Sequence, residues 1–520
     1  MRRDWIPASL RIPRSIAGIV GVLVLVYLGL CSRPIWHTDV WGHLSYGRYI
    51  WRNQTLPATE PLLPLAKGVP FIDGQWLSQL VGLGVISQPR LQVAGLKGLY
   101  ALLVTGCAAM LCRSVYQQTR HGGFALLSLG LFLTIGWIPL SVLRPQLAGL
   151  FCFILVLTRL AHKQVRKPDW IAIPLVFALW ANLHPSFFVG LGLLTCFGFG
   201  RWLDLLFRTG SLWRSSCDRS VWRLFLLTIL ASAAVVLNPY GTGLYVEVWQ
   251  FSANPNLQDL TEWQPMTIRS GEGQSFALVT LLLLIAYRWT PRRLLGWELL
   301  TLTGLGLAGM WSVRMVIWWA PVAAIQLSHH GYAIWRASQQ RPSVVVPAPR
   351  LETWTWVSLM LVLSGLIVSP PGQALLWNKQ SEIGQAVSTM TPVFAAEYLR
   401  QHPPQGLVFN TYEWGDYLQW AGPEGLALFV NSHAHLIPRD TWLAYLQVVE
   451  LQSGWQETLD RYRVNTIVID QAYRGPLIER LRQDVRWQSR ANEQDGQVLF
   501  FREKPIENLA ERDPPPQKSD

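Results

Sequence analysis

The chain has 520 residues, of which half are hydrophobic and only 15% are charged. A soluble globular domain carries about 25% charged residues, so this composition excludes an ordinary soluble protein and favours a membrane protein. The net charge of +12 does not indicate nucleic-acid binding, because Lys and Arg gather in loops between apolar runs, as they do in the cytoplasmic loops of membrane proteins.

Apolar runs of about 15 to 20 residues recur along the first 370 residues and predict a polytopic α-helical membrane domain of about eleven spans. The first run follows a basic N-terminus and lacks a small-residue cleavage site, so we expect a retained span rather than a signal peptide. The apolar segment 76–87 is too short to cross, and we expect it to lie in the membrane interface. The predicted spans are residues 15–31, 91–112, 124–143, 146–161, 170–183, 187–201, 222–237, 275–288, 294–311, 314–330 and 353–370.

The distribution of basic residues predicts the orientation. With the N-terminus in the cytoplasm, about 21 Lys and Arg residues fall inside and about nine fall in the outer loops, in agreement with the positive-inside rule. An odd number of spans then places the C-terminal region outside. The same assignment puts two long loops, 33–90 and 238–274, on the outer side, together with most isolated polar residues at span ends. Polar residues gathered at one membrane face suggest a site there.

After Pro370, short apolar strands alternate with helices, which predicts a small extracytoplasmic α/β domain over residues 371–503. Residues 1–370 would form the transmembrane domain, and the proline-rich tail 504–520 is expected to be disordered. Strands are expected at 406–410, 426–430, 466–470 and 497–502, and helices at 393–400, 442–449, 455–462 and 477–481.

Two histidines, a carboxylate and two indoles follow the first span directly, in the segment 36–44. If this segment is helical, Asp39 and His43 are four residues apart and share one face. The pair could bind a divalent metal, or act as a base with its partner. Alternatively, Asp39 caps a helix and the indoles anchor it at headgroup depth.

Arg144 and Arg314 each occupy the outer end of a predicted span. A guanidinium fork suits phosphate, so each could hold a lipid phosphate, although snorkelling to lipid headgroups is an equal alternative. Asn182 and His184 interrupt an apolar run before Pro185. Amide and imidazole groups in a membrane need partners, which could be a substrate or a neighbouring helix.

Three loop carboxylates, Glu60, Asp73 and Glu262, could orient a substrate or bind a metal, or could be solvated loop charges. His433 and His435 form an H-x-H pair in the C-terminal region, with no third zinc ligand visible. The sequence has no phosphate-binding glycine loop and no serine-hydrolase elbow, so nucleotide hydrolysis and serine-hydrolase chemistry lack support.

A series of motifs extends from the first outer loop to about Arg502. The first motif is Thr38-Asp39-Val40-Trp41-Gly42-His43-Leu44. The others are Gly47-Arg48, Leu56-Pro57, Gly74-Gln75-Trp76-Leu77, Leu143-Arg144-Pro145-Gln146, Trp180-Ala181-Asn182-Leu183-His184, Asn238-Pro239-Tyr240-Gly241, Glu262-Trp263 and Phe409-Asn410-Thr411-Tyr412-Glu413-Trp414-Gly415-Asp416-Tyr417-Leu418. In their order and spacing, these motifs resemble those of bacterial GT-C-type membrane glycosyltransferases. More narrowly, they resemble a poorly characterised group related to polyprenyl-phosphate-dependent sugar transferases.

The resemblance implies an inverting transferase that moves a sugar from a polyprenyl-phosphate-linked donor to an envelope glycan, lipid or protein. The reaction would take place at the outer face of a bacterial plasma membrane. Asp39 would serve as base or metal ligand, with His43 holding it, and Arg144 and Arg314 would hold the leaving phosphate. The remaining substrate contacts would come from Glu60, Asp73, Asn182, His184 and Glu262.

The chain also departs from the related proteins. It has Asn431-Ser432-His433 where they often carry an acidic residue and an arginine. The full metal-ligand set of oligosaccharyltransferases is not apparent either. Two other functions are alternatives: a lipid or sugar transporter or flippase, and a non-catalytic scaffold that binds a partner. A transporter would distribute polar residues through the bilayer midplane, whereas here they gather on one side.

Overall fold

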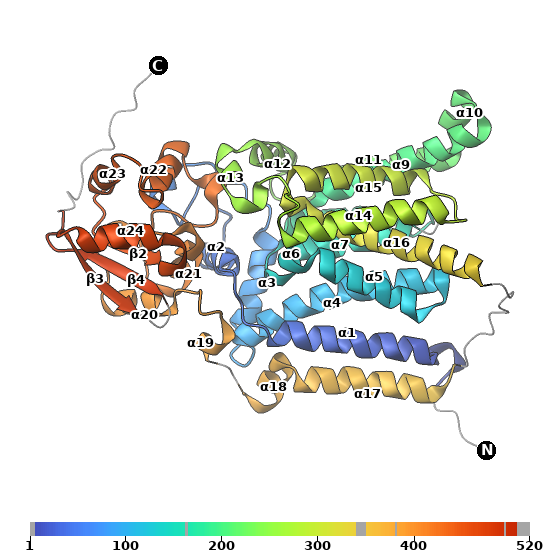
Figure 1. The fold of residues 1–520 in the computed structure, drawn as a ribbon, viewed down its shortest axis with the longest axis horizontal. Coiled ribbons are helices and arrows are strands. Elements are labelled where there is room, and N and C mark those ends of the chain that lie inside the picture. Colours follow the sequence, from blue (N-terminus) through green and yellow to red (C-terminus); the bar gives the residue numbers. More distant parts are fainter. Residues whose placement is uncertain (1–5, 162–164, 340–349, 380–381, 493–495, 507–520) are drawn as a thin grey trace. The chain divides into compact units, whose positions relative to one another are not determined.

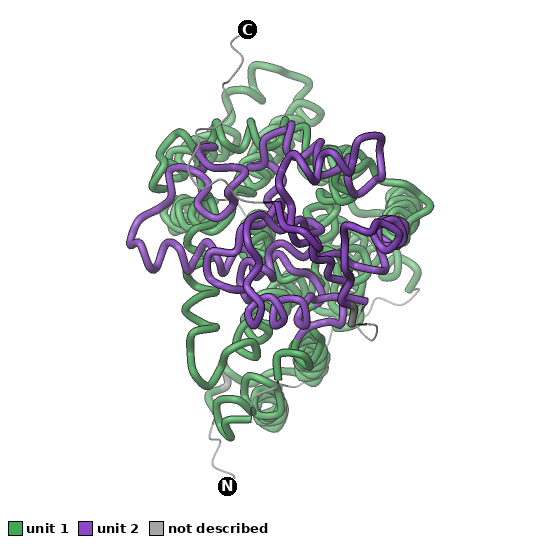
Figure 2. Tube along the Cα trace, turned by 90° about the vertical axis from the view of Figure 1, so that its left-hand side faces the viewer, with its two compact units in different colours: residues 1–35, 72–386 green, residues 36–71, 387–520 purple. Residues whose placement is uncertain are grey.

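The computed structural model describes residues 6–161, 165–339, 350–379, 382–492 and 496–506. These residues form two compact units, coloured green and purple in Figure 2. Unit 1 comprises Met1–Ile35 and Ile72–Ala386, and unit 2 comprises Trp36–Phe71 and Val387–Asp520. The chain therefore leaves unit 1 after its first long helix, contributes one segment to unit 2 and then returns. The domain boundary at residue 370 stays a prediction. Most of the expected disordered tail, residues 507–520, lies outside the described residues.

Unit 1 is helical, and each predicted span coincides with a helix (Figure 1). The segment 124–143 is divided at Gly136 into two helices. The helices are α1 (Arg14–Ser32), α3 (Trp76–Ile86), α4 (Gln92–Thr119), α5 (Gly122–Ile135), α6 (Trp137–Ser141), α7 (Gln146–Leu160), α8 (Asp169–Leu183), α9 (Phe187–Thr209), α10 (Leu212–Ser216), α11 (Arg219–Val235), α12 (Gly243–Ala253), α13 (Pro255–Gln258), α14 (Gly271–Trp289), α15 (Gly296–Trp311), α16 (Val316–Ser338), α17 (Glu352–Val368), α18 (Pro370–Trp377) and α19 (Ile383–Ala386). Short 3-10 turns are η1 (Ala8–Leu10), η3 (Thr261–Trp263) and η4 (Val313–Met315).

The expected number of about eleven spans is not confirmed. Within the described residues, three helices are long and apolar enough to cross a membrane: α1, α4 and α9. A fourth crossing is added if α17 and α18, which bend by 73° at Ser369, form one span. The other helices of the predicted spans are shorter or more polar by this measure, so the total number of crossings stays a prediction.

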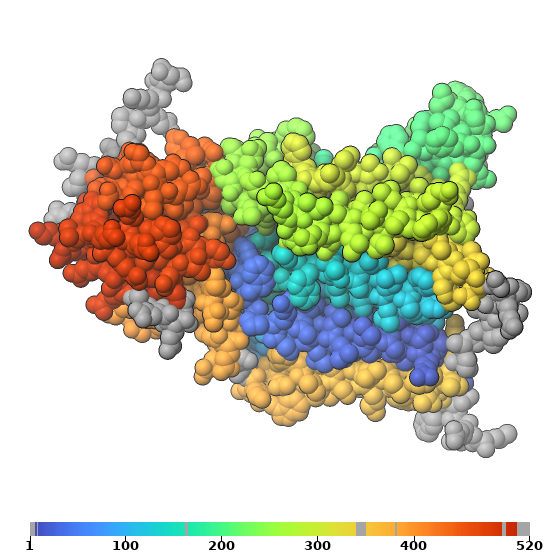
Figure 3. Space-filling model, in the orientation of Figure 1, coloured from blue at the N-terminus to red at the C-terminus, as the bar shows by residue number. Residues whose placement is uncertain are grey.

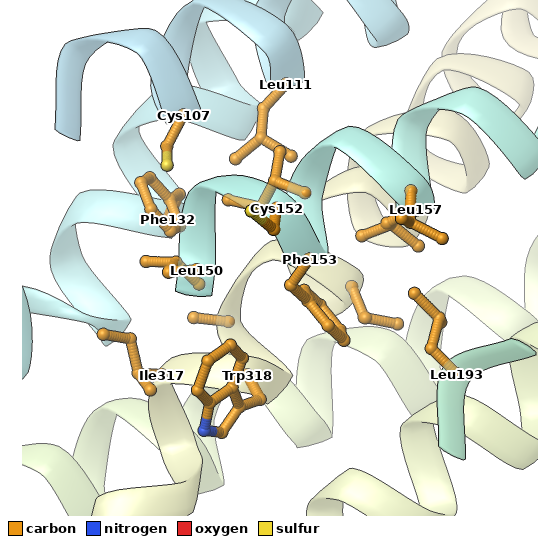
Figure 4. Packing of buried hydrophobic residues seen from close by; sticks show 14 of the residues in the cluster. Cys107, Leu111, Phe132, Leu150, Cys152, Phe153, Leu157, Leu193, Ile317 and Trp318 are labelled. Atoms are coloured by element: carbon orange, nitrogen blue, oxygen red, sulfur yellow. The ribbon is translucent and has the colours of Figure 1, made fainter. Parts of the chain in front are cut away.

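The core of unit 1 surrounds α16, whose first 15 residues, Val316–His330, are all buried. A helix buried on every side has no polar face, which explains the apolar run from Val316 to Ile325. Trp318 of α16 contacts Phe153 of α7, with ring centroids 5.4 Å apart (Figure 4). Cys107 and Cys152, two of the six free cysteines, are buried in the same core.

The long helices of unit 1 run side by side, and α1 packs between α17 and α4 (Figure 1). The short helices α3, α6, α12 and α13 gather at one end of this bundle. We call this the short-helix end. Helix α10 projects from the opposite end, which we call the α10 end (Figure 3).

Unit 2 is built on a four-stranded sheet in the order β1-β2-β4-β3, in which β1 and β2 are parallel and the other pairs are antiparallel. Helix α2 from the early segment packs against α21 through Trp41, which lies 5.3 Å from Tyr417 between ring centroids. The strands are β1 (Val408–Asn410), β2 (Thr466–Asp470), β3 (Trp487–Asn492) and β4 (Gln497–Arg502). The helices are α2 (Asp39–Asn53), α20 (Val393–Gln401), α21 (Tyr412–Ala421), α22 (Arg439–Val449), α23 (Trp455–Arg461) and α24 (Gln471–Gln483), with 3-10 turns η2 (Pro64–Ala66) and η5 (Ala434–Leu436).

One strand prediction in unit 2 is wrong. Residues 426–430 form no strand, only a single bridge between Leu428 and Val408. Side-chain bonding replaces the missing ladder, because Asn410 Oδ1 accepts from the Phe429 N–H at 3.1 Å and its Nδ2 donates to the Val430 carbonyl at 2.8 Å. Residues 426–430 are therefore buried coil. A short apolar run is typical of both buried coil and a buried strand, so the sequence pattern alone could not distinguish them.

Candidate functional site

Four of the predicted site residues meet at the short-helix end of unit 1. We call Arg144, His184, Glu262 and Arg314 the arginine cluster. Arg144 precedes α7, His184 follows α8, Glu262 lies in η3 and Arg314 lies in η4. One carboxylate bridges both arginines: Glu262 Oε2 lies 2.6 Å from Arg144 Nη1, and Glu262 Oε1 pairs with Arg314 Nη1. Two guanidinium charges and one carboxylate leave one positive charge in excess.

The local sequence explains how Glu262 and Arg314 are placed. The turns η3 and η4 are joined by the Val313 N–H, which donates to the Gln264 carbonyl at 3.2 Å. The guanidinium of Arg314 also lies over the Trp263 ring, 5.1 Å from its centroid, so the dipeptide Glu262-Trp263 contacts this arginine twice. Cation–π and ion-pair contacts together restrict the arginine to one position.

His184 belongs to this cluster as a neutral side chain. Pro185 follows it, and a residue before proline avoids the helical region, so α8 ends there with His184 extended at φ −166°. Its Nδ1 accepts from the Ser186 N–H at 3.0 Å, which leaves Nε2 to carry the ring proton. Burial, with the charges of Arg314 and Arg144, lowers the pKa of His184 to about 3.

Asp73 and Asn182 hold neighbouring segments together at the same end. Asp73 Oδ1 accepts from the Gln75 N–H and from Gln79 Nε2, both at 3.0 Å, at the start of α3. Asn182 Oδ1 accepts from Trp76 Nε1 at 3.1 Å, and its amide donates to the Leu237 carbonyl at 3.1 Å. Asn182 thus joins α3 and the end of α11 to α8, which is the helix-contact alternative raised by the sequence.

A close approach ties the Asp73 turn to the His184 turn. A Cβ added to Gly74 would lie 2.9 Å from Pro185 Cγ and 3.0 Å from Leu244 Cδ1, so only glycine fits without movement.

Burial, with the nearby charge of Asp73, raises the pKa of Tyr240 to about 12, so this phenol stays protonated at neutral pH.

The remaining predicted residues, Asp39, His43 and Glu60, belong to unit 2. Helix α2 begins at Asp39, and the expected helix does place Asp39 and His43 one turn apart. A carboxylate in the first turn is favoured by the helix dipole, and Asp39 Oδ1 also lies 2.9 Å from His37 Nδ1. The N-cap of α2 is Thr38, which makes no side-chain capping hydrogen bond, so the capping and catalytic alternatives for Asp39 both stay predictions.

Two residues that we did not single out as catalytic candidates, Asp416 and His433, lie close to this pair. The rings of His43 and His433 meet edge to face with centroids 5.3 Å apart, and His433 Nδ1 lies 4.0 Å from Asp416 Oδ1. Burial lowers the pKa of His433 to about 4, against the opposing charge of Asp39. We call Asp39, His43, Asp416 and His433 the Asp39 cluster. The signal for Asp416 was its place in the motif 409–418, and that for His433 was the H-x-H pair.

Gly42 explains why Asp416 can lie against α2. A Cβ at this position would overlap the Asp416 carboxylate, which is fully buried. The Asp416 carboxylate therefore lies against the α2 backbone at Gly42, where no side chain blocks its approach.

Glu60 is a buried, hydrogen-bonded carboxylate of the segment Trp36–Phe71. It is 4% exposed, its Oε2 accepts from Tyr46 Oη at 2.7 Å, and its Oε1 accepts from the N–H groups of Leu62 at 2.7 Å and Leu63 at 3.0 Å. Burial raises the pKa of Glu60, against these hydrogen bonds. With Asp73 2% exposed, the alternative of solvated loop charges is wrong for both residues.

The metal-binding alternative requires several donor side chains close together, and the described part of the chain does not offer such a set. No group of three or more His, Cys, Asp or Glu side chains there has metal-binding geometry. The Asp39 cluster is therefore not such a group.

Comparisons with solved structures identify the fold. No family model and no curated protein matches the sequence. The Archaeoglobus fulgidus oligosaccharyltransferase in its apo form is 13% identical with a TM-score of 0.51, over 88% of this chain and 70% of that one. The mycobacterial arabinofuranosyltransferase AftD is 13% identical with a TM-score of 0.50, over 94% of this chain and 40% of that one. ArnT from Cupriavidus metallidurans, bound to undecaprenyl phosphate, is 12% identical with a TM-score of 0.48, over 93% of this chain and 97% of that one.

The chain therefore has a GT-C-like fold, as its motifs predicted. It is a mostly helical protein that resembles GT-C membrane enzymes and carries a small sheet near its C-terminus. The poorly characterised subgroup within that class stays a prediction.

Proposed function

We propose that the protein is a membrane glycosyltransferase that moves a sugar from a lipid-linked phosphate donor to an acceptor at the outer face of a bacterial plasma membrane. The GT-C-like fold supports glycosyl transfer in general, because two neighbours of this fold are named as glycosyltransferases. The observation that carries the proposal is the arginine cluster, in which Arg144 and Arg314 share the single carboxylate of Glu262.

The excess positive charge of the arginine cluster suits the leaving group of this reaction. When the bond between the anomeric carbon and the phosphate oxygen breaks, its electron pair moves to that oxygen. Fixed cations that stabilise developing negative charge lower the barrier to such a step. Arg144 and Arg314 would hold the phosphate, and neutral His184 would add a hydrogen-bond donor through Nε2 without adding charge.

The acceptor half of the reaction is assigned to the Asp39 cluster. The acceptor hydroxyl would attack the anomeric carbon from the face opposite the phosphate, and its proton would pass to the Asp39 carboxylate, with inversion at that carbon. His43 would hold Asp39 in place. Buried Asp416 and His433 support this assignment, because they add two titratable groups beside Asp39.

The membrane arrangement is part of the same proposal. About eleven crossings, an N-terminus in the cytoplasm and an extracytoplasmic C-terminal domain would place both clusters on the outer side. The donor would be a polyprenyl-phosphate-linked sugar and the acceptor an envelope glycan, lipid or protein. The short-helix end of unit 1, with its four converging polar residues, supports a polar site at one membrane face.

The decisive test is Asp39→Asn, which removes the base but keeps the size of the side chain. We expect transfer from a lipid-linked donor to fall by at least about 100-fold, since general-base catalysis contributes about 10²–10⁴-fold. Mass spectrometry of envelope glycolipids and glycoproteins would measure the product in cells that carry each variant.

The matched control is Asp440→Asn, because Asp440 is an exposed first-turn carboxylate of α22 in the same unit. Equal protein levels in the membrane must accompany the comparison. Retained transfer in Asp39→Asn would remove Asp39 from the chemistry. Substrate translocation in vesicles without covalent transfer would instead identify a transporter.

A further inference from the structure

A pocket of about 580 Å³ lies in unit 1, and none of its lining residues belongs to the arginine cluster. It is formed by the last residues of α4, the turn after α14 and the second half of α16. These segments belong to the α10 end of the bundle (Figure 1). The lining residues are Gln118, Thr119, Pro291, Arg292, His329, Tyr332, Ala333, Arg336 and Ala337.

The lining of this pocket is cationic. It contains two arginines, and none of its residues, as described, is an Asp or Glu. Arg292 is held in place because its Nη1 lies 2.7 Å from Glu298 Oε1 and 2.8 Å from His330 Nε2. The Glu298 carboxylate, fully buried, balances the charge of Arg292. Arg336, in the last turn of α16 and exposed, therefore supplies the net positive charge of the pocket.

The neutral lining residues include both polar and apolar side chains. Gln118 and Tyr332 provide an amide and a phenol that can donate to anionic oxygens. Pro291, Ala333 and Ala337 provide a small apolar wall. The volume is far greater than the roughly 30 Å³ of one water molecule and lies within the roughly 300–1,000 Å³ typical of ligand sites.

We propose that this pocket binds the phosphate of an anionic phospholipid headgroup, with Arg336 as the principal contact. The apolar wall favours a lipid over free phosphate, because it can receive the glycerol and the first methylene groups. Basic pockets between membrane helices are suited to anionic headgroups for the same electrostatic reason. The assignment is independent of the proposed sugar transfer, because it uses no residue of the arginine cluster or the Asp39 cluster.

The test uses the full-length protein, stripped of lipid in detergent, and native mass spectrometry. The probes are phosphatidylglycerol, phosphatidylcholine of the same chain length, and inorganic phosphate. We expect the protein to bind phosphatidylglycerol at least about fivefold more tightly than phosphatidylcholine, and Arg336→Gln to remove this preference. The matched control is Arg288→Gln, an exposed arginine in the last turn of α14 that does not line the pocket.

A second variant separates the pocket from the charge. Ala337→Leu narrows the pocket without removing a cation, and we expect it to weaken phosphatidylglycerol binding while thermal unfolding stays unchanged. Competition by millimolar inorganic phosphate that depends on Arg336 would support the site and identify free phosphate as its ligand. Equal losses in Arg336→Gln and Arg288→Gln, or no preference for phosphatidylglycerol in the unaltered protein, would overturn the proposal.

Discussion

Both ends of unit 1 contain a glutamate paired with arginine, and the two pairs differ in burial and charge balance. Glu262 at the short-helix end is 34% exposed in its side chain and is shared by Arg144 and Arg314. Glu298 at the α10 end is fully buried and pairs with one arginine, Arg292, and with His330 at 3.7 Å.

The difference indicates which pair can bind a ligand. Glu298 also accepts from the Leu295 N–H at 2.9 Å, so both of its oxygens are used and α15 is capped at the same time. The charges of Glu298 and Arg292 balance, so this buried network has no excess charge to attract an anion. The arginine cluster has more positive than negative charge and its glutamate is partly exposed, which is why phosphate binding is proposed there.

The largest expected effect is on stability at the buried pair. Glu298→Gln would leave Arg292 without its counter-charge, and breaking a buried ion pair costs about 3–5 kcal/mol. The equivalent change Glu262→Gln should lower the free energy of unfolding less, because the Glu262 side chain is 34% exposed whereas that of Glu298 is 0% exposed. Thermal unfolding in detergent measures both variants. Equal destabilisation by the two substitutions would contradict the comparison, because it would show that both ion pairs contribute equally to the free energy of unfolding.

The second effect is on activity at the exposed pair. Arg314→Gln removes one cation from the arginine cluster, and we expect transfer to slow by about 10- to 100-fold with little change in stability. The matched control is Arg269→Gln, an exposed arginine in the loop before α14. A Glu298→Gln protein that still folds should retain its rate per folded molecule. Loss of rate there, with none in Arg314→Gln, would reverse the assignment of the two ends.

The smallest effect is on the pH dependence of stability. His184 in the folded protein has its pKa lowered to about 3, whereas an unfolded histidine protonates near its ordinary value of about 6.5. Between these values the unfolded chain binds more protons, so stability falls as pH falls, by at most about 1.4 kcal/mol per pH unit. His184→Gln should flatten the fall in melting temperature between pH 6.5 and 4.5. The control His402→Gln alters an exposed histidine and should leave it unchanged.

Sequence patterns predicted the long helices of unit 1, because apolar runs and their proline and glycine breaks are local signals, but they missed the short helices α10, α12 and α13. They missed β3, since Gln488, Ser489 and Arg490 are exposed and the strand pairs only with β4. They also missed α21 as an element, although its residues were recognised as a motif.

The candidate site was predicted unevenly. Arg144, Arg314 and His184 were found because isolated polar groups at span ends need partners. Their convergence on Glu262 depends on the tertiary arrangement of four separate helix ends, which no local pattern encodes. The sequence did not distinguish Asp416 from other carboxylates as a candidate site residue, because its close approach to Gly42 is visible only in the structure.

The excursion of Trp36–Phe71 into unit 2 has a consequence for biosynthesis. This segment leaves the ribosome early, whereas α21, against which α2 packs, is in about the last quarter of the chain. Domains commonly fold in the order in which they are synthesised, but unit 2 has to wait for its final residues. Until then α2 must stay unpaired while the membrane helices are inserted. A chain that stops prematurely after unit 1 would therefore leave Trp41 and Gly42 exposed, and quality-control proteases would have a recognisable target.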